Sequence, residues 1–355
     1  MEKTDNLRIV SMQEVITPVD LIASLPLTKD AATTVLDARA AIHKILHGED
    51  DRLLVVVGPC SIHDPQAALE YAEKLAVLRS ELADELVVVM RVYFEKPRTS
   101  IGWKGLINDP DLTGEFNINE GLRKARELML ALANQGIPAA TEYLDLITPQ
   151  YISDLVSWAA IGARTTESQG HRELASGVSC PIGFKNGTYG NVNIAIHAIK
   201  AANRPHRFLS VNKDGHSAIF ETSGNDDCHI ILRGGQQPNY DEENVQKAVN
   251  ELSEAGLTPS LMVDMSHANS SKDYRNQPKV AAEVARQIAH GSSAISGVMI
   301  ESHLKEGRQD GEGKSLDQLV YGQSITDACI GWDDTDRVLH QLAEAVQQRR
   351  QRTEV

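Results

Sequence analysis

Short runs of apolar, mostly β-branched residues recur along the chain, and each is followed by a turn and an amphipathic stretch. The runs are nearly continuous rather than alternating, which is typical of parallel strands covered on both faces. Runs of this kind occupy 53–58, 86–94, 138–144, 158–164, 180–186, 229–234, 261–267 and 296–301. Eight strands that alternate with helices predict an α/β fold, the (β/α)8 TIM barrel, with a doubly wound open sheet as the alternative.

The stretches between the runs carry the start and stop signals of helices. Asp64-Pro65 opens one of them, because proline suits the first helical position. Asp241 can cap another, and Gly136 and Gly256 each follow the last periodic residue of a helix. Apolar residues recur every three or four positions within these stretches, so we expect one face of each helix to pack on the sheet.

Two segments lie outside the repeat of strand and helix. Residues 1–52 precede the first predicted strand and contain a predicted helix at about 30–47. A β-hairpin is predicted at about 207–222, between the fifth and sixth barrel strands. We therefore expect an N-terminal extension that serves assembly or regulation, followed by a catalytic barrel at 53–355 that carries the inserted hairpin.

The composition is that of a folded protein, with 41% apolar and 24% charged residues. The net charge is −14, from 35 basic and 49 acidic residues, so a surface that binds nucleic acid is not expected. No apolar run approaches roughly 18 residues, so no membrane helix is expected. The first residues do not resemble a signal peptide, and four cysteines are too few for a disulfide scaffold. We therefore expect a cytoplasmic protein.

Polar residues that can carry chemistry stand at the carboxyl ends of all eight predicted strands. They are, in chain order, Cys60, Arg91, Glu142, Arg164, Lys185, Arg233, His267 and Glu301. In a barrel these ends share one mouth, where active sites are built. A single such residue is more often structural than functional, but eight in register predict a site.

Positive charge is concentrated at this predicted mouth. Four of the eight residues are cationic, and the loop after the second strand adds Lys96 and Arg98. In a chain of net charge −14, six cations would repel one another unless they bind anions. We infer two phosphates, or a phosphate and a carboxylate, on small substrates. The alternative is a solvated network in which these cations pair with Glu95, Glu142 or Asp109.

A second set of residues at the mouth suits a metal ion. Cys60, His267 and Glu301 end different strands, and Asp327 follows the last one. A thiolate, an imidazole and two carboxylates suit a borderline divalent ion such as Mn²⁺, Fe²⁺, Co²⁺ or Zn²⁺. The chain has no CxxC or HExxH spacing, and its other cysteines have apolar neighbours typical of packing.

At these positions the chain resembles a known family. The motifs that carry the resemblance are GPCSIHD (58–64), RVYFEKPRT (91–99), GWKGL (102–106), GARTTES (162–168), GFKNG (183–187), LRGG (232–235), DMSHAN (264–269) and SITD (324–327). They resemble the feedback-regulated type I 3-deoxy-D-arabino-heptulosonate 7-phosphate (DAHP) synthases of the microbial shikimate pathway. The similarity runs through nearly the whole chain.

The resemblance implies a metal-dependent condensation of phosphoenolpyruvate with erythrose 4-phosphate, which gives DAHP and inorganic phosphate. It implies one divalent ion per subunit, Mn²⁺ in the first place, with Cys60, His267, Glu301 and Asp327 as ligands. The residues implied for phosphoenolpyruvate are Arg91, Lys96, Glu142, Ala163, Arg164, Lys185 and Arg233. Those implied for erythrose 4-phosphate are Pro97, Arg98, Thr99 and Asp327. Lys96 is our candidate proton donor, and either Glu142 or His267 positions the attacking water.

Feedback regulation is also implied by the resemblance, together with a homodimer or homotetramer. The matching inhibitor-pocket positions are Asp5, Asn6, Pro149, Gln150, Leu174, Val178, Ser179, Phe208, Ser210 and Phe220. Ser210 and Pro149 resemble the phenylalanine-sensitive form, whereas Asn6 is similar to the tyrosine-sensitive form and Phe220 is bulkier than usual. We expect phenylalanine as the inhibitor, with tyrosine as the alternative; these residues could equally pack a subunit interface.

Two other functions fit part of the pattern. A different metal-dependent aldolase or phosphosugar isomerase could use a barrel, a metal and phosphate-binding cations. A catalytically inactive sensor of aromatic amino acids could share the scaffold, but the complete set of cations and metal ligands argues against it.

Overall fold

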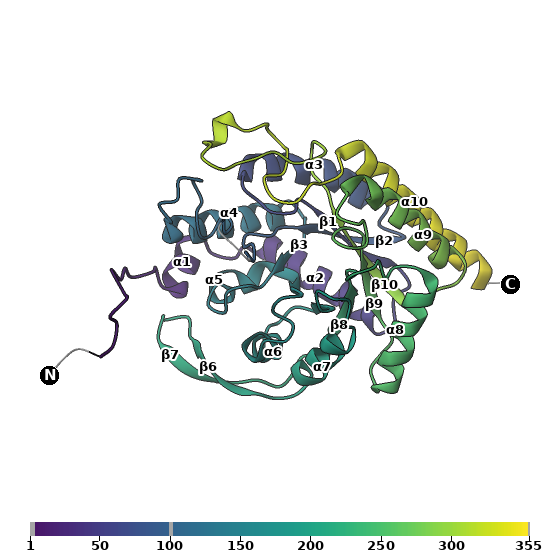
Figure 1. Cartoon of the computed structure of the whole chain (residues 1–355), viewed down its shortest axis with the longest axis horizontal. Coiled ribbons are helices and arrows are strands. Elements are labelled where there is room, and N and C mark those ends of the chain that lie inside the picture. The colour runs from purple at the N-terminus through teal and green to yellow at the C-terminus, as the bar shows by residue number, and fades with distance from the viewer. Residues whose placement is uncertain (1–3, 99–101, 354–355) are drawn as a thin grey trace.

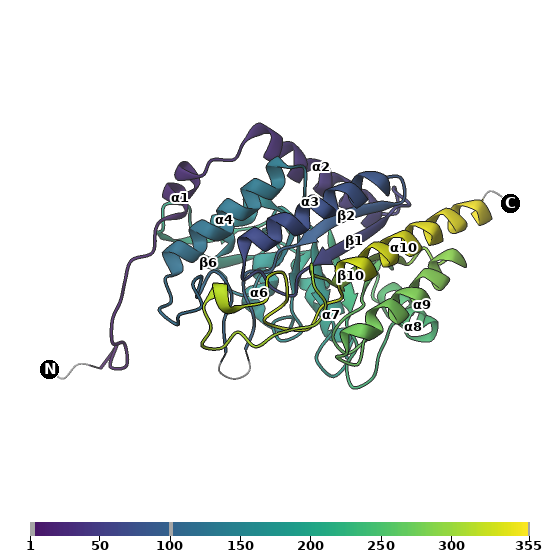
Figure 2. The ribbon, with the colours of Figure 1, turned by 90° about the horizontal axis from the view of Figure 1, so that it is seen from above.

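The computed structural model describes residues 4–98 and 102–353, and within them eight parallel strands close into a barrel surrounded by helices (Figures 1 and 2). The strand order around the barrel is β1-β10-β9-β8-β5-β4-β3-β2. The barrel strands are β1 (Leu53–Gly58), β2 (Leu86–Arg91), β3 (Ala139–Glu142), β4 (Val156–Ile161), β5 (Ile182–Lys185), β8 (Cys228–Leu232), β9 (Leu261–Asp264) and β10 (Ile295–Glu301). The predicted TIM barrel is confirmed, and the open doubly wound sheet is wrong.

Most strands end earlier than predicted. The second predicted run extended to residue 94, for example, but β2 ends at Arg91. Apart from the exposed Arg164, the predicted residues beyond these strands are buried or half-buried all the same, because they turn over the barrel mouth instead of continuing the ladder. The apolar pattern alone could not distinguish buried residues that pair in a strand from buried residues that follow it.

The helices are α1 (Pro18–Ser24), α2 (Lys29–Leu46), α3 (Pro65–Glu81), α4 (Ile118–Asn134), α5 (Pro149–Ile152), α6 (Gln169–Ala175), α7 (Asn193–Ala202), α8 (Glu242–Glu254), α9 (Gln277–Ala289) and α10 (Trp332–Thr353). Two predicted caps are confirmed. The Asp64 carboxylate accepts hydrogen bonds from the backbone N–H groups of Gln66 and Ala67, and that of Asp241 accepts one from the N–H of Asn244. Gly136 follows α4 with a φ of +77°, a left-handed conformation that favours glycine.

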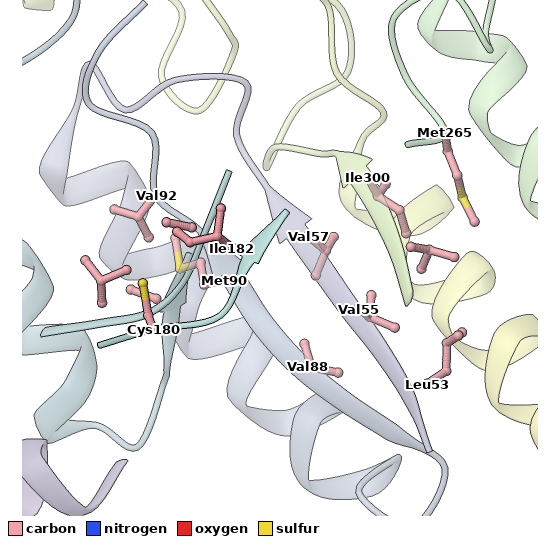
Figure 3. Packing of buried hydrophobic residues seen from close by; sticks show 14 of the residues in the cluster. Leu53, Val55, Val57, Val88, Met90, Val92, Cys180, Ile182, Met265 and Ile300 are labelled. Carbon is pink, nitrogen blue, oxygen red and sulfur yellow. The ribbon is translucent and has the colours of Figure 1, made fainter. Parts of the chain in front are cut away.

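The core has two parts because neighbouring residues of a strand face opposite sides of the barrel wall. Leu53, Val55 and Val57 of β1 belong to the outer cluster, between the strands and the helices, which Figure 3 shows in part. Leu54 and Val56 belong to the inner cluster, which fills the barrel. This inner cluster also contains Ile42, Ile45 and Leu46 of α2. The N-terminal helix therefore packs against the barrel interior, an arrangement that sequence periodicity did not reveal.

The predicted hairpin is confirmed as β6 (Arg207–Val211) and β7 (Ser217–Glu221), which pair in antiparallel fashion apart from the barrel. In both views the segment before α1 extends away from the body of the protein (Figures 1 and 2). None of the helices in the described part of the chain has the length and hydropathy of a membrane-spanning segment.

Candidate active site

A cavity of about 180 Å³ opens at the carboxyl ends of the barrel strands. It is lined by predicted site residues and by three that were not predicted, Gly162, Thr165 and Thr188. The predicted ones are Lys96, Pro97, Arg98, Glu142, Ala163, Arg164, Lys185, Arg233, His267 and Asp327. Five cationic side chains from distant parts of the chain thus share one small cavity, as the charge argument predicted. The shared mouth of a barrel is what brings them together.

Three of the four predicted metal ligands converge beside this cavity. The ligand atoms of Cys60, Glu301 and Asp327 all lie within 4.8 Å of one another. The fourth, His267, places Nε2 4.0 Å from Glu301 Oε1. A thiol, two carboxylates and an imidazole suit a borderline divalent ion, and such an ion would offset the repulsion between the buried Glu301 and the more exposed Asp327. The residues present therefore fit the metal that the resemblance implies.

Lys96 extends into this cluster of metal-seeking groups. Its Nζ lies 3.1 Å from Cys60 Sγ and 3.3 Å from the Cys60 carbonyl oxygen. Burial opposes the charge of Lys96, but the nearby Cys60 and Glu301 outweigh burial and raise its pKa. Burial first, and Glu301 second, raise the pKa of the Cys60 thiol to about 11. Lys96 is therefore a protonated group between the metal ligands and the open cavity.

Arg91 lies beneath the cavity and is not one of the side chains that line it. Its guanidinium donates to Glu301 Oε1 at 3.0 Å and to the carbonyl oxygens of Pro59 and Cys60. It also lies 3.6 Å from the centroid of the Tyr93 ring. In this arrangement Arg91 neutralises a predicted metal ligand, and its contact with a substrate carboxylate stays a prediction.

Asp264, which was not among the predicted site residues, links two of them. Its Oδ2 lies 3.1 Å from Lys185 Nζ and 2.8 Å from His267 Nδ1. Asp264 is fully buried, and although burial opposes ionisation, His267 and Lys185 hold its pKa well below the usual range. A buried aspartate at the end of β9 was the available sequence signal, because an unpaired carboxylate is costly there.

The lack of a side chain at Gly162 leaves room for Glu142 at the mouth. A Cβ at Gly162 would lie 2.6 Å from Glu142 Oε1, so a side chain at this position would displace that carboxylate. Asn186 supports the neighbouring cation, since its Oδ1 accepts a hydrogen bond from the Arg233 backbone N–H at 2.8 Å. Burial lowers the pKa of Arg233, which favours an anionic partner in the cavity.

The outer rim of the cavity is more exposed. Arg164 is exposed, and Arg98 donates through Nε to the carbonyl oxygen of Trp103 at 2.8 Å. Thr99, predicted to contact the sugar phosphate, lies outside the described residues. The rim residues thus present charged groups to incoming ligands rather than to one another.

The predicted inhibitor-pocket residues lie in the N-terminal segment, in the hairpin, and in α5, α6 and the turn before β5. The hairpin contacts α5 and the end of α6, because Lys213 donates to the Gln150 carbonyl oxygen and the hydroxyls of Ser176 and Thr222 are 2.7 Å apart. Phe208 and Phe220 face each other across the hairpin, with ring centroids 6.0 Å apart.

The remaining predicted pocket residues divide between the body and the N-terminal segment. Leu174 and Pro149 are buried, whereas Asp5 and Asn6 are exposed in the segment that extends from the body (Figure 1). The inhibitor site that these residues would form stays a prediction.

The chain is similar over nearly its whole length to known proteins of one family. Residues 25–340 match the DAHP synthetase I family. The chain is 62% identical over 348 residues to the Phe-sensitive phospho-2-dehydro-3-deoxyheptonate aldolase of Escherichia coli (strain K12), covering 98% of this chain and 99% of that relative. It is 53% identical over 349 residues to the Trp-sensitive one of the same strain, covering 98% and 100%. A solved phospho-2-dehydro-3-deoxyheptonate aldolase from Francisella tularensis SCHU S4 has a TM-score of 0.94 at 52% identity and covers 96% of this chain and 99% of that chain.

Proposed function

The chain belongs to the DAHP synthetase I family, and from that membership we propose that it condenses phosphoenolpyruvate with erythrose 4-phosphate to DAHP and inorganic phosphate. It is a transferase that catalyses the first step of the shikimate pathway to aromatic amino acids. One observation carries the assignment of the site: a thiol and two carboxylates within 4.8 Å of one another adjoin a cavity lined by five cations. Two small polyanions and a metal ion match that combination of charges.

Cys60, His267, Glu301 and Asp327 would hold the divalent ion, which is Mn²⁺ in this proposal, with Fe²⁺, Co²⁺ or Zn²⁺ as alternatives. When bound, such an ion supplies Lewis-acid polarisation of a substrate oxygen. The hydrogen bond from Arg91 to Glu301 orients one ligand of this set, and the contact between Asp264 and His267 orients another.

The cations divide between the two substrates. Arg164, Lys185, Arg233 and the backbone of Ala163 bind the phosphate of phosphoenolpyruvate, while Lys96 and Arg91 act on its carboxylate. Pro97, Arg98, Thr99 and Asp327 bind erythrose 4-phosphate. By neutralising two polyanions that repel each other, these residues hold the reacting carbons together, so positioning and preorganised charge supply much of the rate.

Proton transfer falls to residues at the boundary between the metal ligands and the cavity. As the enol carbon attacks the aldehyde carbon, Lys96 gives its proton to the aldehyde oxygen. Water then adds to the cationic carbon left behind and loses a proton to the group that positions it, and the bond from this carbon to the phosphate oxygen breaks to release inorganic phosphate. Glu142 and His267 both line the cavity, and either one positions that water.

Regulation by phenylalanine is part of the proposal, with tyrosine as the alternative effector. The relative named Phe-sensitive is more similar to this chain than the one named Trp-sensitive. We assign the effector to the predicted pocket of the N-terminal segment, the hairpin and the start of the fifth barrel strand, β5. Assembly into a homodimer or homotetramer would bring one subunit's N-terminal segment to a partner's hairpin, which agrees with the exposed apolar residues of both.

The extension at 1–52 serves assembly and regulation in this proposal, and the barrel at 53–355 carries the catalytic site. We place the enzyme in the cytoplasm because all four of its cysteines are free, as a reducing compartment keeps them.

A coupled assay tests the proposal. Purified protein is given phosphoenolpyruvate and erythrose 4-phosphate, and release of inorganic phosphate is followed before and after chelation, with each aromatic amino acid added in turn. Phosphate release that requires both substrates and a divalent ion supports the function. An aldolase or isomerase of another type would not release phosphate in a reaction that requires both substrates. Activity that stays unchanged with each aromatic amino acid would contradict the proposed feedback inhibition.

A further inference from the structure

A second group of metal-seeking side chains lies far from the active site. Asp227 Oδ1 lies 2.7 Å from His43 Nδ1 and 2.9 Å from His47 Nε2. The two imidazole rings come from neighbouring turns at the end of α2, with centroids 4.3 Å apart. One ligand atom from each of the three residues lies within 4.8 Å of the other two.

This group lies at the opposite end of the barrel from the catalytic cavity. Asp227 directly precedes β8, whose carboxyl end leads to Arg233 at the mouth. His43 and His47 belong to the end of the helix whose Ile42, Ile45 and Leu46 pack into the barrel interior. The group therefore joins the N-terminal helix to a strand 180 residues later in the chain.

We propose that His43, His47 and Asp227 form a second metal site, for a divalent transition ion of the zinc type, with water completing the coordination. Two imidazoles and a carboxylate suit Zn²⁺, and two histidines four residues apart present their rings on one helix face. The side chains are 45%, 31% and 20% exposed, so an ion reaches them from solvent without any rearrangement of the core.

The contacts in the metal-free form explain how the site is prepared. Asp227 Oδ1 accepts a hydrogen bond from His43 Nδ1 and another from His47 Nε2, and these bonds already hold the three ligands together. When an ion binds, it takes the place of the protons in these hydrogen bonds. Any proton on a ligating imidazole nitrogen is then released to solvent. An ion held by α2 and the start of β8 would link the helix to the barrel, so its role is structural and stabilises the folded chain.

The test counts zinc ions on the full-length enzyme. Zn²⁺ binding is titrated by calorimetry, and bound ions are counted by elemental analysis. Both measurements are made on wild type, Cys60→Ser, His47→Gln and Asp227→Asn. We expect two ions per chain for wild type and one for each variant. In Cys60→Ser, which keeps only the proposed second site, Zn²⁺ should raise the Tm. Adding His47→Gln to this variant should abolish that rise and weaken its zinc binding at least ~10-fold. His197→Gln, an exposed histidine on α7, is the matched control.

The design separates this site from the catalytic one. If His47→Gln and Asp227→Asn keep the zinc count and the Tm response of wild type, the second site does not exist. If Cys60→Ser alone changes the count, only the catalytic ligands bind zinc. His47→Gln should retain DAHP synthase activity, and folding of both variants is verified by circular dichroism, so a lost ion cannot be attributed to unfolding.

Discussion

The ammonium of Lys96 lies 3.1 Å from the sulfur of Cys60, so a cation and a metal-seeking thiol meet where the catalytic cavity adjoins the metal ligands. The two residues come from loops that follow neighbouring strands, β1 and β2. Because Lys96 also lines the open cavity, it can reach a substrate atom that lies beside the residues that would hold the metal. This position is the one that the proposed proton donor requires.

Lys96→Ala is expected to abolish turnover while the metal content stays at or above that of wild type. The substitution removes the proposed proton donor, a contribution of roughly 10²–10⁴-fold for a positioned acid. It also removes a positive charge that repels a divalent ion. Steady-state kinetics and elemental analysis of the same preparation measure the two effects. Lys200→Ala, on the exposed face of α7, is the control, and normal turnover of Lys96→Ala would remove this residue from the mechanism.

Chelation is expected to remove activity, and a divalent ion should restore it in wild type but not in Cys60→Ala. Cys60 supplies the only sulfur among the four proposed ligands, and its loss leaves His267 and two carboxylates, which hold a borderline ion more weakly. Metal content and phosphate release are measured after removal and after restoration. Cys228→Ala, at the start of β8, should behave as wild type. Recovery of full activity by Cys60→Ala would show that the thiol is not a ligand.

Much of this architecture could be predicted from the sequence, because strands and helix starts are specified by residues that are close together in the chain. Continuous apolar runs identified all eight strands, and Asp64 and Asp241 identified helix starts because capping uses residues three positions apart or fewer. The mouth residues followed from a rule of the fold, which places the carboxyl ends of parallel strands together.

What the sequence did not reveal depends on contacts between distant residues. Asp264 closes an apolar run, a signal that marks the position but not the partners, and its role appears only when Lys185 and His267 are placed beside it. Arg91 was predicted as a ligand-binding cation because its position in the strand is right. Its pairing with Glu301, 210 residues later, is fixed only by the closed barrel.

Asp264→Asn is expected to lower kcat/KM by roughly 10- to 100-fold, the usual cost of removing a group that orients metal or substrate ligands. The amide cannot neutralise Lys185 and His267 together, so the buried cation loses its partner and His267 loses its orientation. Separate kcat and KM values for phosphoenolpyruvate distinguish the two losses. Asp310→Asn, an exposed aspartate, serves as control. Kinetics equal to wild type would mean that Asp264 has no positioning role.

Leu209→Glu is expected to reduce the oligomeric state. Leu209 and Ile219 are directly opposite each other on the hairpin and are 80% and 75% exposed, an apolar pair that the single chain leaves uncovered. A carboxylate in a subunit interface would be desolvated without a partner. Light scattering during size-exclusion chromatography measures the mass, and Val77→Glu, on the exposed side of α3, is the comparison. An unchanged mass for Leu209→Glu would exclude the hairpin from the interface.

Glu95 lies between the catalytic loop and the predicted inhibitor pocket. It is buried, and its Oε1 accepts a hydrogen bond from the Thr148 hydroxyl at 3.4 Å, next to Pro149. Burial first, and the charge of Asp145 second, raise the pKa of Glu95 to about 8. The folded protein therefore retains a proton on Glu95 that the unfolded chain loses near pH 4.5.

Stability is expected to fall as the pH rises from about 4.5 to about 8, because across this window the folded state binds more protons than the unfolded state. Glu95→Gln keeps the neutral shape without a titrating proton, so it should match wild type near the lower limit and exceed it by up to a few kcal/mol near the upper one. Urea unfolding at several pH values measures the difference, with Glu167→Gln, an exposed glutamate, as control. If wild type and Glu95→Gln lose stability in parallel across this window, Glu95 is ionised in the folded enzyme and the argument from burial is wrong.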